Sequence, residues 1–265
     1  MTPYYDKDGA TIYLGDSLEV LRALRPSLIG QVNAIVMDPP YASGARTEAG
    51  KRASGAMQYS GGHWDSRPIF NDEMTTNGLV WLMRETAVLA REMVLQRGSM
   101  LSFIDWRQWP NLCGAVECAG WRVNQMVVWD KLYAALGNGY RNRHELILHA
   151  SIGTADVQHK SGSNVIECAL EDVLKHKRER NTVHPSMKPV GLMRELVSVV
   201  APAGGLVVDP FMGAGATLLA CRDLGVRAIG IEVVEEYAEA AAKRLDGFTP
   251  ANETGTDAWQ GGLGL

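Results

Sequence analysis

The sequence predicts an α/β fold in which a mostly parallel, twisted sheet is covered by helices on both faces. Short β-branched apolar segments alternate with amphipathic segments of helical spacing along most of the chain, which is typical of such a sheet. Two of the apolar segments end in loops, Asp38-Pro39-Pro40-Tyr41 and, far downstream, the Gly-rich residues 209–217. Ligands bind at the carboxyl ends of the strands in open α/β sheets, so we expect both loops to border one site.

The predicted elements follow one another in the order that this fold requires. Each strand is a short apolar segment, and each helix has apolar residues at intervals of three and four. The expected strands cover residues 11–14, 32–37, 100–104, 123–129, 145–149, 206–208 and 227–231. The expected helices cover residues 17–24, 79–96, 188–200, 217–224 and 236–245. Gly98 fits a stop signal for the second of these helices.

We expect one domain over residues 1–265, because this length suffices for a single large α/β core. Residues 42–77 are rich in Gly, Ser, Arg and Thr with little periodicity, which predicts a long loop, and loops of this length inside compact domains are usually functional or mobile. Residues 151–183 are polar and basic with two short apolar stretches, which predicts a small inserted module. The Gly-rich residues 249–265 predict a flexible tail.

Composition and charge exclude several classes of protein. With 46% hydrophobic and 21% charged residues and no long apolar segment or signal peptide, the sequence predicts a cytoplasmic protein without a membrane partner. Its four cysteines lack paired short spacing, so we expect neither a metal site nor disulfides. The net charge of −4 argues mildly against a polyanionic partner, although basic clusters stand out and each could be only a solvated surface. The clusters are Arg46, Lys51 and Arg52; Arg141 and Arg143; and Lys175, Lys177, Arg178 and Arg180.

The Gly-rich loop has the features of a cofactor site. Gly213 and Gly215 let the backbone approach a ligand closely within a tight strand-to-helix turn. A dinucleotide fingerprint would need a third glycine at Leu218, and a P-loop would need Gly-Lys-Ser/Thr, so both phosphate motifs are incomplete. Asp209 suits a cationic ligand, and Glu232, at the end of the next strand, suits the two hydroxyls of a ribose. A ribose joined to a positive centre describes S-adenosylmethionine; a plain glycine turn and a nicotinamide cofactor are the alternatives.

The first loop predicts a chemical role. The exocyclic amine of adenine or cytosine is a weak nucleophile, because its lone pair is delocalised into the ring. The Asp38 carboxylate and the Pro39 carbonyl can accept hydrogen bonds from both amine hydrogens, while Pro39 and Pro40 stiffen the loop. Tyr41 offers a flat face on which an extruded base can stack. Direct in-line methyl transfer then needs no covalent intermediate, and no cysteine follows a proline as a ring-carbon methylase would need. The alternative is a rigid turn without catalytic function.

Together the two loops resemble the motifs of the amino-group DNA methyltransferases, which methylate N6 of adenine or N4 of cytosine. The catalytic motif precedes the cofactor motif, a circularly permuted order that resembles the beta class. Residues 15–21, 128–131, 145–148 and 184–189 are similar to further segments of the family in the same order. The resemblance implies a Rossmann-like methyltransferase fold, S-adenosylmethionine as the cofactor, no metal, and double-stranded DNA with a flipped base as the substrate.

The resemblance also implies residue roles. Asp16 would contact the adenine of the cofactor, and residues 184–189 would pack near its methionine end. The basic clusters would contact DNA phosphates, residues 151–183 would recognise the target sequence, and the 42–77 loop would border the flipped base. The implied catalytic set is Asp38, Pro39, Pro40 and Tyr41. The implied cofactor-binding set is Asp16, Ser17, Asp38, His184, Lys188, Pro189, Asp209, Phe211, Gly213, Ala214, Gly215, Ala216, Thr217 and Glu232.

The sequence departs from the family pattern at Ala214 and Ala216, where relatives commonly carry Ser and Thr. Two hydroxyl contacts to the cofactor are therefore absent, and the alternatives are that backbone donors suffice or that the cofactor binds more weakly. The recognition insert is short, which is compatible with a brief target sequence or with a homodimer. Asp38 favours adenine, since enzymes of this kind that modify cytosine usually carry Ser there, and N4-cytosine methylation is the nearest alternative. Relatives that act on RNA or protein glutamine tend to carry Asn and the opposite motif order. A non-catalytic DNA-binding module would not need the acceptor at Asp38 or the ring of Tyr41.

Overall fold

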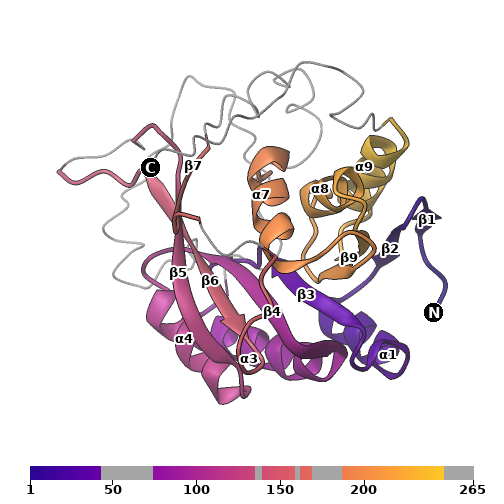
Figure 1. The fold of residues 1–265 in the computed structure, drawn as a ribbon, viewed down its shortest axis with the longest axis horizontal. Helices are drawn as coiled ribbons and strands as arrows, with labels where there is room; N and C mark the ends of the chain where they lie inside the picture. The colour runs from indigo at the N-terminus through magenta and orange to yellow at the C-terminus, as the bar shows by residue number, and fades with distance from the viewer. Residues whose placement is uncertain (43–73, 135–138, 159–161, 169–186, 248–265) are drawn as a thin grey trace.

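The structure is a computed structural model that describes residues 1–42, 74–134, 139–158, 162–168 and 187–247, in which one sheet lies between two layers of helices (Figure 1). The strands are β1 (Tyr5–Lys7), β2 (Ala10–Leu14), β3 (Val32–Met37), β4 (Val94–Ile104), β5 (Arg122–Asp130), β6 (His144–Ser151), β7 (Val165–Glu167), β8 (Leu206–Asp209) and β9 (Arg227–Glu232). The helices are α1 (Ser17–Leu28), α3 (Thr76–Met93), α4 (Trp109–Cys118), α7 (Val190–Val200), α8 (Ala216–Asp223) and α9 (Glu235–Asp246).

The order of strands across the sheet is β1-β2-β9-β8-β3-β4-β6-β5-β7. Parallel pairing joins β2, β9, β8, β3 and β4 in turn, whereas β6 runs antiparallel to both β4 and β5. The chain continues from β3 to β4 on one side and from β8 to β9 on the other, so the topological switch point lies between β3 and β8. The loops after these two strands therefore open next to each other. This confirms the mostly parallel α/β fold that the sequence predicts.

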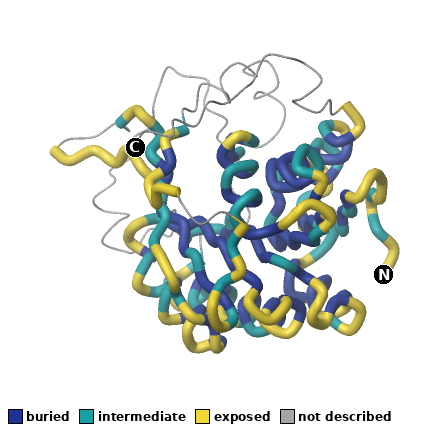
Figure 2. Tube along the Cα trace, in the orientation of Figure 1, coloured by how far each residue is buried: buried dark blue, intermediate teal, exposed yellow. Residues whose placement is uncertain are grey.

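Both faces of the sheet are buried under helices. Ile35 and Met37 of β3 pack in one core with α1, α3 and α4, while Ala34 and Val36 pack in a second core with α7, α8 and α9. These four side chains are fully buried, and β3 lies deep inside the molecule (Figure 2). Side chains that alternate between two cores fix the register of the strand. The loop that follows β3 thus begins from a rigid base.

The second helix ends earlier than its predicted limit at residue 96. α3 stops at Met93, and β4 starts at Val94, so the predicted stop signal at Gly98 was wrong. A Cβ atom at Gly98 would lie only 2.7 Å from the Asn33 carbonyl oxygen of β3 and 2.3 Å from a methyl of Val94. Glycine is needed here because the backbones of β3 and β4 approach closely where their register shifts.

Among the elements that the structure describes, β1, α4 and β7 were not predicted. The first is a short exposed strand paired with β2, and α4 begins with a proline in its first turn. Strand β7 pairs in parallel with β5, so residues 165–167 of the expected insert belong to the sheet. Residues 43–73 of the expected long loop, 159–161 and 169–183 of the insert, and the expected tail lie outside the described residues.

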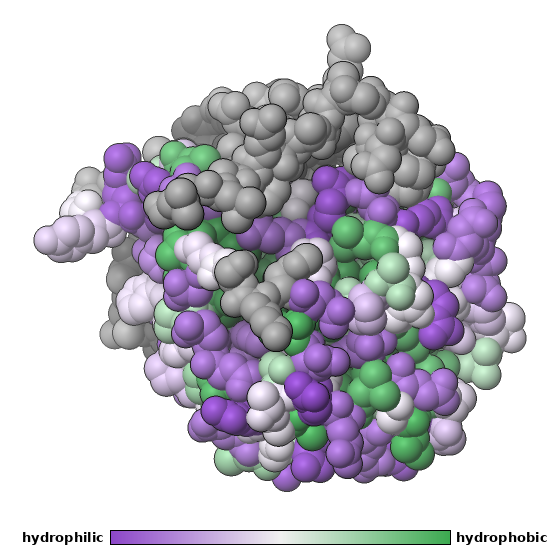
Figure 3. Space-filling model, viewed as in Figure 1, coloured by the Kyte–Doolittle hydropathy of each residue, from purple (hydrophilic) through white to green (hydrophobic). Residues whose placement is uncertain are grey.

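On the face of the molecule shown in Figure 3, hydrophilic residues surround small groups of apolar ones. Among the helices that the structure describes, none has the length and apolar character needed to cross a membrane.

Candidate active site

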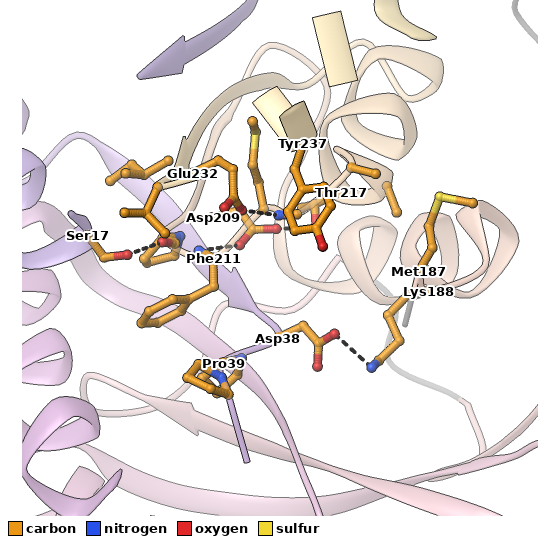
Figure 4. Close-up of a pocket in the computed structure, with 18 of the residues that line it drawn as sticks. Ser17, Asp38, Pro39, Met187, Lys188, Asp209, Phe211, Thr217, Glu232 and Tyr237 are labelled. Carbon is orange, nitrogen blue, oxygen red and sulfur yellow. Dashed lines mark hydrogen bonds and ion pairs between the residues drawn. The ribbon is translucent and has the colours of Figure 1, made fainter. Parts of the chain in front are cut away.

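A cleft of about 250 Å³ opens at the switch point between β3 and β8 (Figure 4). The loops after these strands form its two sides, and the ends of β2 and β9 with the starts of α1, α7 and α9 complete it. The cleft brings together most of the residues expected to function. Those that line it are Asp16, Ser17, Asp38, Pro39, Pro40, Tyr41, Lys188, Asp209, Phe211, Gly213, Ala214, Ala216, Thr217 and Glu232.

Asp209, the last residue of β8, is held firmly at one side of the cleft. Its side chain accepts hydrogen bonds from the Thr217 hydroxyl at 2.5 Å and from the Phe211 backbone N–H at 3.0 Å. Only 2% of the residue is exposed, and this burial raises the pKa of Asp209 to about 7 despite the two donors. A carboxyl group with this pKa gains its charge readily when a cationic ligand approaches.

Glu232, the last residue of β9, braces the Gly-rich loop. One carboxylate oxygen accepts the Gly213 N–H at 3.0 Å, and the other accepts the Val234 N–H at 2.8 Å. Burial raises the pKa of Glu232, although these backbone donors oppose the effect. Each carboxylate oxygen can accept more than one hydrogen bond, so both oxygens keep acceptor capacity toward the cleft.

The two glycines of the loop have different roles in the structure. Gly213 lines the cleft with φ of 51°, a left-handed conformation that favours glycine. Gly215 caps the start of α8 with φ of 77°, and a Cβ atom there would lie 2.8 Å from the Cβ of Ala241 on α9. Gly215 is absent from the cleft lining, and its small size serves the packing of α8 against α9.

The turn between β2 and α1 forms another part of the wall. The Asp16 carboxylate caps α1 by accepting the N–H groups of Leu18 at 3.0 Å and Glu19 at 3.1 Å. Ser17 donates its hydroxyl to the Pro210 carbonyl at 2.5 Å, which ties this turn to the loop after β8. Asp16 therefore has a structural role in addition to its place in the cleft.

Asp38 lies across the cleft at the end of β3, within a cluster of charged side chains. Its Oδ2 is 2.7 Å from the Lys188 ammonium, and its Oδ1 accepts the Tyr41 hydroxyl at 2.5 Å. Lys188 also lies 3.2 Å from Glu145, the second residue of β6, and Glu145 pairs with Lys131 on its other side. Figure 4 shows Asp38 and Lys188 facing each other from different elements.

Charge and burial oppose each other in this cluster. Burial raises the pKa of Asp38, and the Lys188 charge works against this rise. The pKa of Glu145 falls to about 2, because Lys188 and Lys131 together outweigh its burial. Burial alone would lower the pKa of Lys188, but Asp38 and Glu145 raise it. Lys188 therefore stays cationic although only 8% of its side chain is exposed.

The ring of Tyr41 is also engaged. The Lys188 ammonium lies 5.3 Å from the centre of the Tyr41 ring and 5.0 Å from that of Phe103. Burial and the two neighbouring carboxylates raise the pKa of Tyr41 well above its usual value, so its hydroxyl keeps the proton that it donates. The stacking of a base on Tyr41 stays a prediction.

The sequence analysis overlooked several residues of the cleft. Glu145 was noted only as part of a strand, and Met187 and Tyr237 were not singled out as site residues, although all three line the cleft. Pro189 caps α7 without lining the cleft, and His184 lies outside the described residues. Among the residues that the structure describes, no cluster of three or more His, Cys, Asp or Glu could hold a metal ion.

The structure describes only two of the residues expected to contact DNA. Arg143 forms a two-pronged pair with Asp130, with both N–O distances at 2.6 Å, so its guanidinium orders the chain next to β5. Arg141 is exposed nearby. The members outside the described residues are Arg46, Lys51, Arg52, Lys175, Lys177, Arg178 and Arg180.

Comparisons with known proteins agree with this arrangement. A family model described as DNA methylase matches residues 32–243. "Putative methylase YubD" of Escherichia coli (strain K12) is 29% identical over 231 residues, which cover 86% of this chain and 88% of that protein. The structure of the M1.HpyAVI-SAM complex has a TM-score of 0.66 at 24% identity and covers 89% of this chain and 99% of that one. PvuII DNA methyltransferase (cytosine-N4-specific) has a TM-score of 0.70 at 16% identity and covers 94% of this chain and 90% of that one.

The two solved structures confirm the fold, and the family model includes both loops that form the cleft. It also includes β6 with Glu145 and the turn that carries Lys188. The chain therefore belongs to the DNA methylase family, which comprises S-adenosylmethionine-dependent enzymes that methylate the amino group of adenine or cytosine in DNA.

Proposed function

We propose that this protein transfers a methyl group from S-adenosylmethionine to the N6 amino group of an adenine that is flipped out of double-stranded DNA. The observation that carries the proposal is the meeting of two loops in one cleft at the switch point. The loop after β3 offers acceptors for an amine, and the loop after β8 offers close backbone approach with a buried carboxyl group. A binding module would have no use for this pairing.

The donor and acceptor groups of the cleft fit the cofactor. Glu232 would accept the ribose hydroxyls with its remaining lone pairs, and Asp209 would face a positive group, since its pKa of about 7 lets it ionise on contact. Phe211, Met212 and Ile231 add apolar wall. When bound, S-adenosylmethionine supplies an electrophilic methyl group carried on a positively charged sulfur. Ala214 and Ala216 leave the Gly-rich loop to bind through its backbone.

Asp38 and Pro39 would orient the base. The carboxylate of Asp38 accepts one amine hydrogen and the backbone carbonyl of Pro39 the other, which frees the nitrogen lone pair for attack. Burial raises the pKa of Asp38, and the Lys188 ammonium, 2.7 Å from Oδ2, opposes this rise and so favours the ionised carboxylate. The proton that the amine loses on methylation then has the Asp38 carboxylate as its nearest acceptor. The same loop would hold the flipped ring against Tyr41.

N4-cytosine methylation is the second candidate. One structure with a similar fold is described as cytosine-N4-specific, so the fold is compatible with this chemistry as well. The presence of Asp rather than Ser at position 38 supports adenine here. The basic clusters of the sequence would hold the DNA backbone, with Arg141 as the exposed member among the described residues.

The test uses purified protein, DNA free of methylated bases and radiolabelled S-adenosylmethionine. After digestion to nucleosides, we expect label in N6-methyl-2′-deoxyadenosine; label in N4-methyl-2′-deoxycytidine would overturn the adenine assignment. Asp38→Ala should abolish incorporation while leaving DNA binding intact. Asp156→Ala is the matched control, because this exposed aspartate follows β6 at the opposite edge of the sheet. Methylation by Asp38→Ala at the wild-type rate would refute the proposed mechanism.

A further inference from the structure

Both oxygens of the Asp38 carboxylate are engaged in the structure. Oδ1 accepts the Tyr41 hydroxyl at 2.5 Å, and Oδ2 accepts the Lys188 ammonium at 2.7 Å. A base amine that approaches Asp38 must share or displace one of these donors. The cluster therefore needs somewhere for the displaced donor to go, since an unpaired buried ammonium is costly.

The same two donors have a second acceptor in common. Oε2 of Glu145 lies 3.1 Å from the Tyr41 hydroxyl and 3.2 Å from the Lys188 ammonium. The other oxygen of Glu145, Oε1, is held by the Lys131 ammonium. Lys131 thus holds one oxygen of Glu145, and the other oxygen faces the two donors that bind Asp38.

We propose that Glu145 is a positioning residue. When the amino group of the target base donates its hydrogen bond to Asp38, the Tyr41 hydroxyl and the Lys188 ammonium donate to Glu145 instead. The inference rests on the proposed function, because it assumes that Asp38 accepts the base. Glu145 does not touch the base in this scheme. It acts through Lys188 and Tyr41, and the exchange makes the Asp38 oxygens available.

The exchange of hydrogen-bond acceptors should cost little free energy. The two donors already lie within hydrogen-bond range of both acceptors, so it requires only small side-chain movements. Lys131, Glu145, Lys188 and Asp38 alternate in charge, so the Lys188 ammonium keeps a carboxylate partner throughout the exchange. The ammonium also stays next to the Tyr41 and Phe103 rings, which contribute cation–π attraction.

Glu145→Gln tests this role, because glutamine keeps the size and one acceptor oxygen but loses the charge. The Lys188 ammonium should then stay paired with the Asp38 carboxylate, and we expect kcat for methylation to fall at least about tenfold. The KM for S-adenosylmethionine and the dissociation constant for S-adenosylhomocysteine, measured by calorimetry, should stay within about twofold of wild type. Glu145→Asp restores the charge and should recover part of kcat. Glu117→Gln, an exposed position on α4, is the control.

The pH profile separates positioning from a merely structural role. The groups that face Asp38 are Lys188, Glu145, Tyr41 and, more distantly, Asp209. Because the Glu145 charge raises the pKa of Asp38, its loss should move the acid limb of kcat to lower pH even as the plateau falls. A limb that stays in place or moves upward contradicts the inference.

The outcomes also distinguish this inference from the proposed function. If Asp38→Ala abolishes methylation and Glu145→Gln retains the wild-type kcat, only the role of Glu145 is overturned. If Asp38→Ala methylates normally, the proposed function itself fails. If Glu145→Gln loses cofactor affinity together with kcat, Glu145 shapes the cofactor side of the cleft and the positioning role is wrong.

Discussion

Lys188→Met should destabilise the protein strongly, because it removes the ammonium that lies between Asp38 and Glu145. Methionine has a similar length and can keep the contacts with the Tyr41 and Phe103 rings, so the variant isolates the charge. Removing one partner from a buried ion pair costs about 3 to 5 kcal/mol. The side chains of Asp38 and Glu145 are 24% and 19% exposed, so we expect a cost at the lower end of this energy range. We expect a loss of about 3 kcal/mol at pH 8, which corresponds to about 6 to 12 °C in melting temperature.

The loss should depend on pH in a defined direction. Without Lys188, burial raises the pKa of Asp38 further above its value in the unfolded chain. A raised carboxyl pKa favours the folded state at low pH, and this advantage disappears as the pH rises through the folded-state pKa. The variant should therefore approach wild type near pH 5 and fall furthest below it at pH 8.

Differential scanning calorimetry at pH 5 and pH 8 measures both effects. Lys243→Met is the matched control, because Lys243 pairs with Glu239 on the exposed face of α9. This variant should have the melting temperature of the wild type at both pH 5 and pH 8. A loss below about 1 kcal/mol at pH 8, or a larger loss at pH 5 than at pH 8, would refute the account of the cluster.

Three further predictions concern the Gly-rich loop and the two carboxyl groups next to it. Asp209→Asn should flatten the pH dependence of stability between about pH 4 and 7, since the raised pKa of Asp209 makes the wild type lose stability over that interval; melting curves that stay parallel would contradict this. Gly215→Ala should cost about 1 to 3 kcal/mol in urea unfolding, because its Cβ would lie 2.8 Å from Ala241, and Ala241→Gly should recover part of the loss. Glu232→Gln should weaken S-adenosylhomocysteine binding about tenfold by calorimetry, and an unchanged affinity would remove Glu232 from the site.

The sequence allowed the cleft to be located before its walls were known. Asp38 follows one buried strand and Asp209 is the last residue of another, and parallel strands have their carboxyl ends on the same side of the sheet. Local patterns were enough here, because each loop directly follows the strand that positions it. The two strands are neighbours in the sheet, which the motifs suggested and the pairing of Ala34 with Val207 confirms.

The partners of Asp38 required information that no local pattern contains. Glu145 is 104 residues from Tyr41, and it reaches the site because β6 runs antiparallel to β4. Because β6 runs in this direction, its start lies next to the carboxyl ends of the parallel strands. Gly98 shows the same limit, because the glycine that fits a helix stop serves the approach of two strands that are distant in sequence.

The two ends of the described chain meet on the half of the sheet that holds the Gly-rich loop. Tyr4 donates its hydroxyl to Glu239 at 2.9 Å, and Lys7 pairs with Asp246 at 3.0 Å, so β1 lies against α9. A chain that joined the end of α9 to the start of β1 through a linker and opened between β4 and α4 would keep every strand neighbour. In such a chain the Gly-rich loop would precede Asp38, yet the same cleft would form. The linear order of the two loops is therefore a property of where the chain is cut, and the chemistry of the site is independent of it.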